Sequence, residues 1–197
     1  MNNREKILKI LTQKKGIILR KDLIKENIPT TYLTLLVNEK ILERVGRGVY
    51  TDINSFGDDF FKTQVVSKNA IYSYNTALYL HKLSNRTPIK YDLTVPYNYN
   101  GSLMKNKSVN IYRVKREILE LGVSIMKSPS GQEIRVYDKE RTICDIIKHK
   151  NKIDNEIVIQ AIKFYVREID SDLHKLGKYA KILKVDKALN KYLEVLL

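Results

Sequence analysis

The chain has 197 residues, and its 36 Lys and Arg outweigh 22 Asp and Glu to give a formal net charge of +14. A hydrophobic fraction of 43% is enough for packed cores, which excludes a disordered basic tail. A single cysteine excludes an internal disulfide and a cysteine zinc cluster. We expect a cytoplasmic protein without a membrane partner, because the sequence contains neither a signal peptide nor a membrane-length apolar run. The charge favours a polyanionic partner.

The first fifty residues predict a winged helix-turn-helix. An apolar helix ends before Gly16, a second short helix begins after Arg20 and ends near Pro29, and a third covers residues 30–40. A tight hairpin over residues 41–50 closes the unit. Three short helices followed by such a hairpin are typical of proteins that place one helix in the major groove and the hairpin beside it. The same layout can also serve protein contacts.

The third helix has one apolar face and one polar face. Leu33, Leu36 and Val37 have the spacing of a buried stripe, which leaves hydroxyl and amide side chains on the opposite face. Hydroxyls and amides can read base edges in the major groove. The residues expected to contact bases on or beside this helix are Thr30, Thr31, Tyr32, Thr34 and Asn38.

Contacts to phosphates must come from outside this helix, because it carries little charge. Gly46 and Gly48 allow a tight hairpin with the intervening arginine at its tip. The residues expected to contact phosphates are Arg20, Lys21, Arg44 and Arg47.

Turn-forming residues at 51–59 place a boundary between a DNA-binding domain, residues 1–56, and a second domain, residues 57–197. We expect Asp58 or Asp59 to cap the first helix of this domain, and Asp154 and Ser171 to cap two later helices. Helices are expected at 58–68, 75–83, 138–148, 153–169, 171–183 and 187–196, and strands at 92–96, 109–114, 122–125 and 133–137. The predicted fold class is α+β: a winged helix-turn-helix followed by a mixed α/β domain that ends in helices.

One segment of the second domain, residues 138–145, concentrates charged residues at a helix start. Asp138 can cap the helix, and Arg141 can pair with Asp138 or with Asp145 one turn away. A capped helix with an internal ion pair and a functional site are both compatible with this spacing. Cys144 falls on a face that should be buried, so we expect a core thiol rather than a nucleophile.

An enzyme is a weaker alternative. Asp92 opens one predicted strand, and Glu133 and Arg135 lie on another, which gives them a loose similarity to the acidic pair and basic residue of metal-dependent nucleases. The three histidines are isolated, and no spacing suits a metal pair or a phosphate loop, so we expect no metal, cofactor or catalytic residue.

A lysine-rich tail could add an auxiliary DNA contact or form a solvated face: Lys175, Lys178, Lys181, Lys184, Lys187 and Lys191.

Three stretches together resemble one known family. The sequence KGIILRKDLIKENIPTTYLTLLVNEKILERVGRGVY, residues 15–50, is similar to the winged helix-turn-helix of AbiEi-family antitoxins. The similarity continues through residues 70–96, and the segment YDKERTICDIIKHK, residues 137–150, resembles the motif common in that family.

The resemblance implies an antitoxin of a bacterial type IV toxin–antitoxin system linked to abortive infection, a form of phage defence. It implies a second domain that opposes an AbiEii-like nucleotidyltransferase toxin without a stable complex. It also implies a first domain that represses the operon by binding inverted repeats in double-stranded operator DNA. The residues it marks for antitoxicity are Asp138, Glu140, Arg141 and Asp145. A winged-helix transcriptional regulator whose second domain senses a small ligand is the alternative.

Overall fold

The structure is a computed structural model that describes residues 2–54, 59–67, 69–100, 108–129 and 131–196. These residues form two compact units. The first consists mainly of the chain up to residue 67 and also takes in residues 127–134, and the second contains most of the remainder. The expected Asp58 cap lies outside the described residues, as does the expected division between residues 56 and 57.

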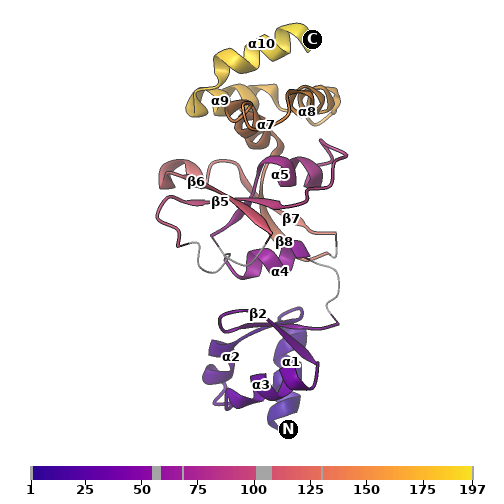
Figure 1. The fold of residues 1–197 in the computed structure, drawn as a ribbon, viewed down its shortest axis with the longest axis vertical. Helices are drawn as coiled ribbons and strands as arrows, with labels where there is room; N and C mark the ends of the chain where they lie inside the picture. Colours follow the sequence, from indigo (N-terminus) through magenta and orange to yellow (C-terminus); the bar gives the residue numbers. More distant parts are fainter. Residues whose placement is uncertain (1, 55–58, 68, 101–107, 130, 197) are drawn as a thin grey trace. The chain divides into compact units, whose positions relative to one another are not determined.

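The first unit has the helix and strand order of a winged helix-turn-helix (Figure 1). Its antiparallel three-stranded sheet has the order β1-β3-β2, in which β2 and β3 form the wing hairpin. The elements are α1 (Asn3–Gln13), β1 (Ile17–Leu19), α2 (Arg20–Lys25), α3 (Thr31–Asn38), β2 (Leu42–Gly46), β3 (Val49–Asp52) and, after a connection, α4 (Asp59–Val65).

Apolar residues from all three N-terminal helices and from the sheet form one core. α1 begins with a capping box in which Asn2 and Glu5 each accept a hydrogen bond from the other's backbone N–H. The core residues are Ile7, Leu11, Ile18, Leu23, Ile28, Leu33, Leu36 and Leu42. Burial of one helix face in this core leaves the opposite face of α3 to solvent.

The prediction for the first unit is confirmed in outline, with two differences. The third helix is shorter than expected, because Lys40 adopts a left-handed φ of 57° that no continuing helix allows. The strand β1 was not predicted, since its three apolar residues show no alternation. It pairs with β3, where Ile18 lies opposite Tyr50, and so closes the wing sheet against α1.

The second unit contains a five-stranded mixed sheet with the order β6-β5-β4-β8-β7. β4 pairs antiparallel with β5 and parallel with β8, and β5 and β6 run parallel. The elements of this part are β4 (Ile71–Tyr72), α5 (Tyr74–Leu80), β5 (Tyr91–Pro96), β6 (Val109–Val114), α6 (Arg116–Leu119), β7 (Val123–Lys127), β8 (Glu133–Tyr137), α7 (Lys139–Lys148), α8 (Asn155–Arg167), α9 (Leu173–Leu183) and α10 (Asp186–Leu196).

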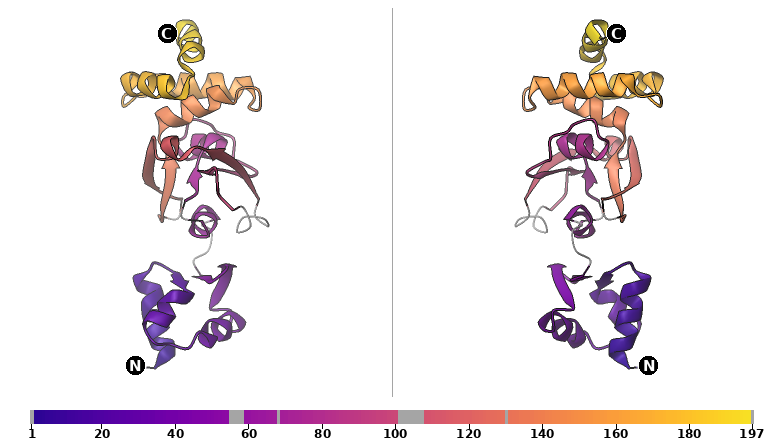
Figure 2. Two further views of the ribbon diagram at one scale, coloured as in Figure 1. Left: turned by 90° about the vertical axis from the view of Figure 1, so that its left-hand side faces the viewer. Right: turned by 90° about the vertical axis from the view of Figure 1, so that its right-hand side faces the viewer.

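Five helices of this unit, α5, α7, α8, α9 and α10, are stacked on one side of the sheet (Figure 1). α5 and α7 lie next to the strands, α8 and α9 form the next layer, and α10 is outermost (Figure 2). α7 is the centre of this stack, with Ile143, Cys144, Ile146 and Ile147 all buried in a core shared with α5, α8, α9 and α10. The helical tail is therefore an integral part of the second unit.

The expected strands at 109–114 and 133–137 and the expected Asp154 cap are confirmed. The expected Ser171 cap is wrong: the N-cap of α9 is Asp172, one residue later, and its side chain accepts the hydrogen bond from the N–H of Lys175. β4 and α6 were not predicted. A two-residue strand buried on both faces has no alternation, and a single helical turn has no periodicity.

Gly122 occupies a tightly packed position in the second unit. Its φ is +75°, and a Cβ there would lie 2.6 Å from the Cβ of Arg141. The Gly122 carbonyl also accepts a 2.7 Å hydrogen bond from the N–H of Asp138 at the start of α7. We therefore expect Gly122→Ala to lower the free energy of unfolding by about 2–5 kcal/mol, measured by chemical denaturation.

Gly177 in the middle of α9 is the matched control, because a Cβ there would meet no atom within 4 Å. Gly177→Ala should be neutral or stabilise by about 0.5–1 kcal/mol. Equal effects of the two substitutions would show that the close approach at Gly122 does not constrain the fold.

Candidate nucleic-acid interface

The exposed face of α3 carries the polar side chains that the sequence placed there. Thr31, Thr34 and Asn38 are exposed, whereas Leu33 and Leu36 are buried on the other face. Thr30 is half-buried at the N-cap position, and its hydroxyl makes no capping hydrogen bond. These hydroxyl and amide groups suit contacts to base edges.

Tyr32 differs from its neighbours on α3. It is half-buried and packs against the core of the first unit. Its ring therefore contributes to the packing of α3, and only part of the side chain is available to a partner.

The wing presents two exposed arginines. Gly46 and Val49 pair across the hairpin, which leaves Arg47 and Gly48 as its two-residue tip. Gly48 has a φ of +70°, the left-handed conformation that such tight turns require. Arg44 lies on β2, and its Nε donates to the Gly46 carbonyl at 3.4 Å. A cation at the tip of a hairpin is placed to meet a phosphate.

The start of α2 lies against the same hairpin tip. The N–H of Arg20 donates to the Gly48 carbonyl at 2.9 Å, so the exposed Arg20 and Lys21 begin α2 beside the wing. Asp22 faces inward, where its carboxylate accepts from the Leu19 N–H at 2.9 Å and pairs with Lys14 at 2.7 Å. Burial acts to raise the pKa of Asp22, but these two partners outweigh it and hold that pKa below its usual value.

The segment 138–145 forms a buried network in the second unit. The Arg141 side chain is 1% exposed, and its Nε donates to both carboxylate oxygens of Asp145 at 3.0 Å. Its Nη1 donates to the carbonyls of Ile118 and Leu121 at 2.7 and 3.0 Å. The guanidinium also lies over the ring of Tyr137, 4.3 Å from its centroid. One arginine thus joins α7 to the turn between α6 and β7.

Glu140 and Asp138 extend this network to α8 and α9. Glu140 accepts from the Tyr165 hydroxyl at 2.9 Å and pairs with Lys175 at 2.9 Å. Lys175 also reaches Asp138 at 3.0 Å, while Asp138 caps α7 through the Arg141 N–H. Burial acts to lower the pKa of Lys175, but the two carboxylates outweigh it and raise that pKa. These side chains clamp three helices together.

Burial sets the protonation of two further groups on α7. It raises the pKa of Asp145 to about 6, against the opposing charge and hydrogen bonds of Arg141. It also raises the pKa of the Cys144 thiol to about 12. The expectation of a core thiol is confirmed, because a fully buried thiol with this pKa is neutral at physiological pH.

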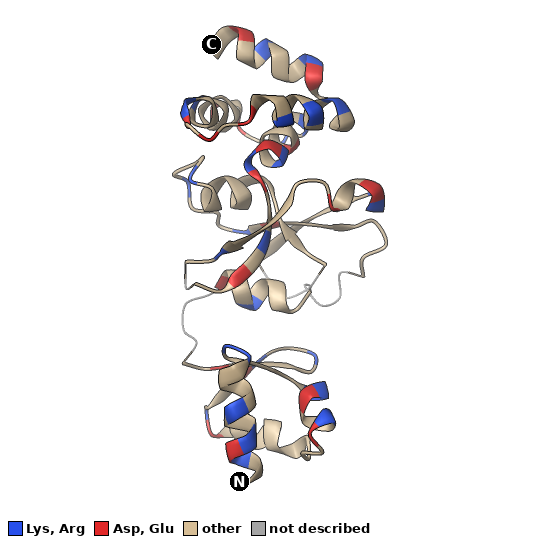
Figure 3. Ribbon diagram, turned by 180° about the vertical axis from the view of Figure 1, so that it is seen from behind, with Lys and Arg blue, Asp and Glu red and all other residues tan. Residues whose placement is uncertain are grey.

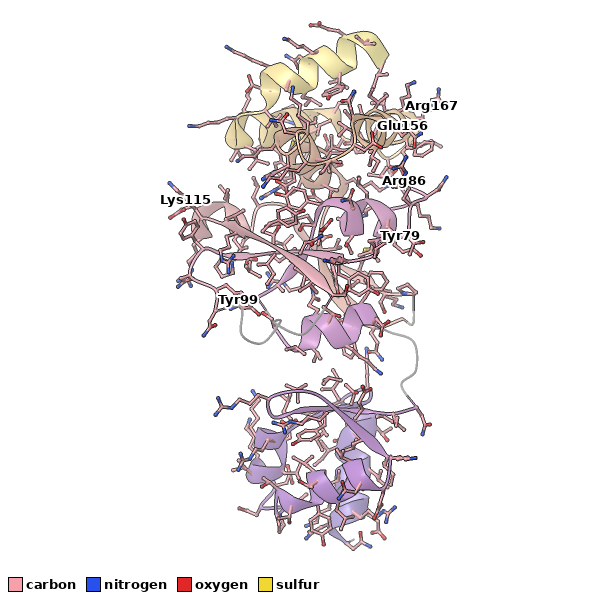
Figure 4. The ribbon with its side chains drawn as sticks, viewed as in Figure 1. Tyr79, Arg86, Tyr99, Lys115, Glu156 and Arg167 are labelled. Carbon is pink, nitrogen blue, oxygen red and sulfur yellow. The ribbon has the colours of Figure 1, made fainter. Side chains whose placement is uncertain are left out.

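A second polar feature surrounds Asp92 on β5, which the sequence singled out only for the enzyme alternative and which is buried in a hydrogen-bond network. Its carboxylate accepts from the Asn75 N–H at 3.0 Å and from the Asn110 side chain at 2.8 Å. Asp92 lies at the wall of a cavity of about 420 Å³ that Arg86 also lines. Arg86 pairs with Glu156 of α8 at 3.5 Å, and both are labelled in Figure 4.

The residues of the enzyme alternative do not assemble a metal site among the described residues. Glu133 is exposed, and Arg135 forms a 2.7 Å ion pair with Glu120. In this described part of the chain, no three His, Cys, Asp or Glu side chains are grouped to hold a metal ion. Its helices also include none with the length and apolar character needed to cross a membrane.

Comparison with known proteins first indicates a class: the N-terminal part of the chain is similar to a family of transcriptional regulators. Residues 5–51, which extend from α1 into β3, match the family described as "Transcriptional regulator, AbiEi antitoxin". These residues are therefore similar to the AbiEi antitoxin regulators, and the resemblance drawn from the sequence is confirmed over them.

Solved structures also resemble the chain, and one of them is similar across most of its length. The RV2827C protein from Mycobacterium tuberculosis superposes with a TM-score of 0.62 at 10% identity, over 91% of this chain and 71% of that chain. At this identity the likeness concerns the fold alone. None of the curated proteins compared with the sequence matches it.

The Arg141 network makes a prediction for stability. Arg141→Met leaves Asp145 buried without its cation and the carbonyls of Ile118 and Leu121 without their donor. We expect a loss of about 3–5 kcal/mol in the free energy of unfolding, measured by chemical denaturation at pH 7.5.

Arg135→Met is the matched control, since the partner of Arg135 in its ion pair, Glu120, is 66% exposed. Its expected cost is below about 1 kcal/mol. If the Arg141 variant lost no more stability than the Arg135 variant, the network would not hold the second unit together.

Proposed function

We propose that the chain is an antitoxin that represses its own operon and opposes a nucleotidyltransferase toxin. The match of residues 5–51 to regulators of the AbiEi antitoxin type carries this proposal. In it, the first domain, residues 1–56, binds inverted repeats in operator DNA, and the second, residues 57–197, supplies antitoxicity without a stable complex with the toxin. The protein acts in the cytoplasm, where its DNA lies, and it is not an enzyme. Abortive infection in response to phage is the physiological setting that we propose.

The proposed division of labour on DNA follows the chemistry of the two exposed surfaces. Thr30, Thr31, Tyr32, Thr34 and Asn38 would specify sequence through base edges. Arg20, Lys21, Arg44 and Arg47 would position the domain on phosphates, which carry no sequence information. A single winged helix reads one half-site, so inverted repeats require two copies on DNA.

The four residues that the resemblance marks for antitoxicity have a supporting role in this proposal and do not contact the partner themselves. Arg141 and Asp145 are almost completely buried, and Glu140 is 5% exposed. We propose that Asp138, Glu140, Arg141 and Asp145 support antitoxicity by fixing α7 against its neighbours, while other side chains of the second unit contact the partner.

The ligand-sensing regulator remains the second candidate because of one observation, the cavity beside Asp92. A cavity of about 420 Å³ with a buried carboxylate lies within the size range of small-molecule sites. In that case a ligand bound in the cavity should change the affinity for operator DNA. An antitoxin of the proposed kind needs no small-molecule ligand.

Two substitutions separate phosphate contacts from base contacts. We expect Arg47→Ala to weaken operator and random DNA alike by about fivefold to tenfold and to flatten the salt dependence by about one phosphate contact. Asn38→Ala should weaken the operator and leave random DNA unchanged. Fluorescence anisotropy of labelled duplexes over a salt series measures both.

Lys115→Ala is the control for the loss of one positive charge, since Lys115 is exposed in the second unit, makes no side-chain capping hydrogen bond and lies outside the lysine-rich tail. It should leave both affinities within about twofold of the parent chain. Unchanged binding by the Arg47 variant would remove the wing from the interface.

Co-expression tests the antitoxin half of the proposal. The gene directly downstream should encode the toxin, and its product should stop growth. We expect residues 57–197 alone to restore growth, while binding to the upstream DNA requires residues 1–56. A downstream product that is not toxic, or toxicity that the full chain does not relieve, would favour the ligand-sensing regulator.

A further inference from the structure

A groove of about 700 Å³ lies along the outermost helix of the second unit, between α10 and α8. The side chains that line it on α10 recur at helical spacing from Lys187 to Leu196, so the groove follows that helix for almost its whole length. At 1.5 Å per residue this corresponds to about 14 Å, or two and a half turns.

The floor of the groove is apolar and open to solvent. Val195 is 83% exposed. Ile159 of α8 lines the groove together with Val195, Ala188 and Tyr192 of α10. Leu189, the buried residue of α10, anchors that helix to the core on its other side. Ala188, Tyr192 and Leu196 also pack partly against that core, so Val195 is the groove residue of α10 whose apolar side chain is left largely to solvent.

The two walls of the groove are already held in place. The Tyr192 hydroxyl donates to the Asn155 side chain at 3.0 Å, which fastens α10 to the start of α8. A preformed groove binds a partner without the cost of ordering its own walls.

The rim of the groove is cationic. Four lysines line it, and none of the lining residues is acidic: Lys150, Lys163, Lys187 and Lys191. None of the four forms a salt bridge within the described residues. The basic residues of α9 and α10 are marked in blue in Figure 3. An occupant with negative charges would complement this rim.

We propose that this groove binds an acidic amphipathic helix of a protein partner. An apolar stripe on such a helix would cover Ile159, Tyr192 and Val195, and its carboxylates would meet the rim lysines. A second copy of this chain would bring like charges together. Nucleic acid would present phosphates to an apolar floor. The proposal stands independently of operator binding and of the toxin's identity.

The test uses the full chain and a labelled 14-residue peptide with Leu at positions 3, 7, 10 and 14 and Glu at most other positions. Fluorescence anisotropy should detect binding, and replacing every Glu by Gln should weaken it by about tenfold or more. Lys187→Glu with Lys191→Glu should have the same effect. Val195→Asp, at a site exposed enough to leave folding unchanged, should also weaken binding about tenfold.

The control variant is Lys178→Glu with Lys181→Glu, which makes the same charge change at exposed positions of α9 outside the groove. It should stay within about twofold of the parent chain. Any of four results would overturn the proposal: no peptide binding, equal binding of the Gln peptide, equal losses in the two lysine pairs, or full binding by the Val195 variant. A DNA duplex could also be added to compete with the peptide. If it displaced the peptide equally well from the parent chain and from the Val195 variant, the surface would be assigned to nucleic acid instead.

Discussion

The second unit depends on one buried arginine. The guanidinium of Arg141 satisfies Asp145 and the carbonyls of Ile118 and Leu121, and it does so almost without contact to water. A buried charge pair of this kind contributes little by itself, but the loss of either partner is costly. The chain therefore has to bring α7, the turn after α6 and the sheet into register together. Gly122 is required at that turn because any side chain there would meet Arg141.

This network changes how the most distinctive sequence segment is understood. Residues 137–150 draw attention as a motif, yet the structure uses their charged side chains to join helices inside the unit. Surfaces that can meet a partner lie elsewhere: the polar face of α3, the wing, and the cationic groove on α10. The buried motif holds α7 against α8, α9 and the turn after α6, and so fixes the relative positions of side chains that lie far apart in the sequence.

Much of the fold could be predicted from periodicity and turn signals. The three N-terminal helices, the wing, and the strands at 109–114 and 133–137 all have local patterns that survive tertiary packing. β1, β4 and α6 have no such pattern, since each is too short to show a period. The pairing of Arg141 with Asp145 was one of two options that the spacing allowed. Its bonds to Ile118 and Leu121 depend on long-range contacts, as do the groove and the Asp92 cavity, and no local signal marks them.

The central claim is that this winged helix reads DNA of its own operon. Footprinting of the full chain on the DNA upstream of its gene tests that claim most directly. The account predicts two protected half-sites related by a two-fold axis, with centres separated by about one helical turn or a multiple of it. Protection of the half-sites should weaken in an Asn38→Ala variant while random duplexes are bound as before. Absence of any protected site at concentrations that already coat random DNA would contradict the account.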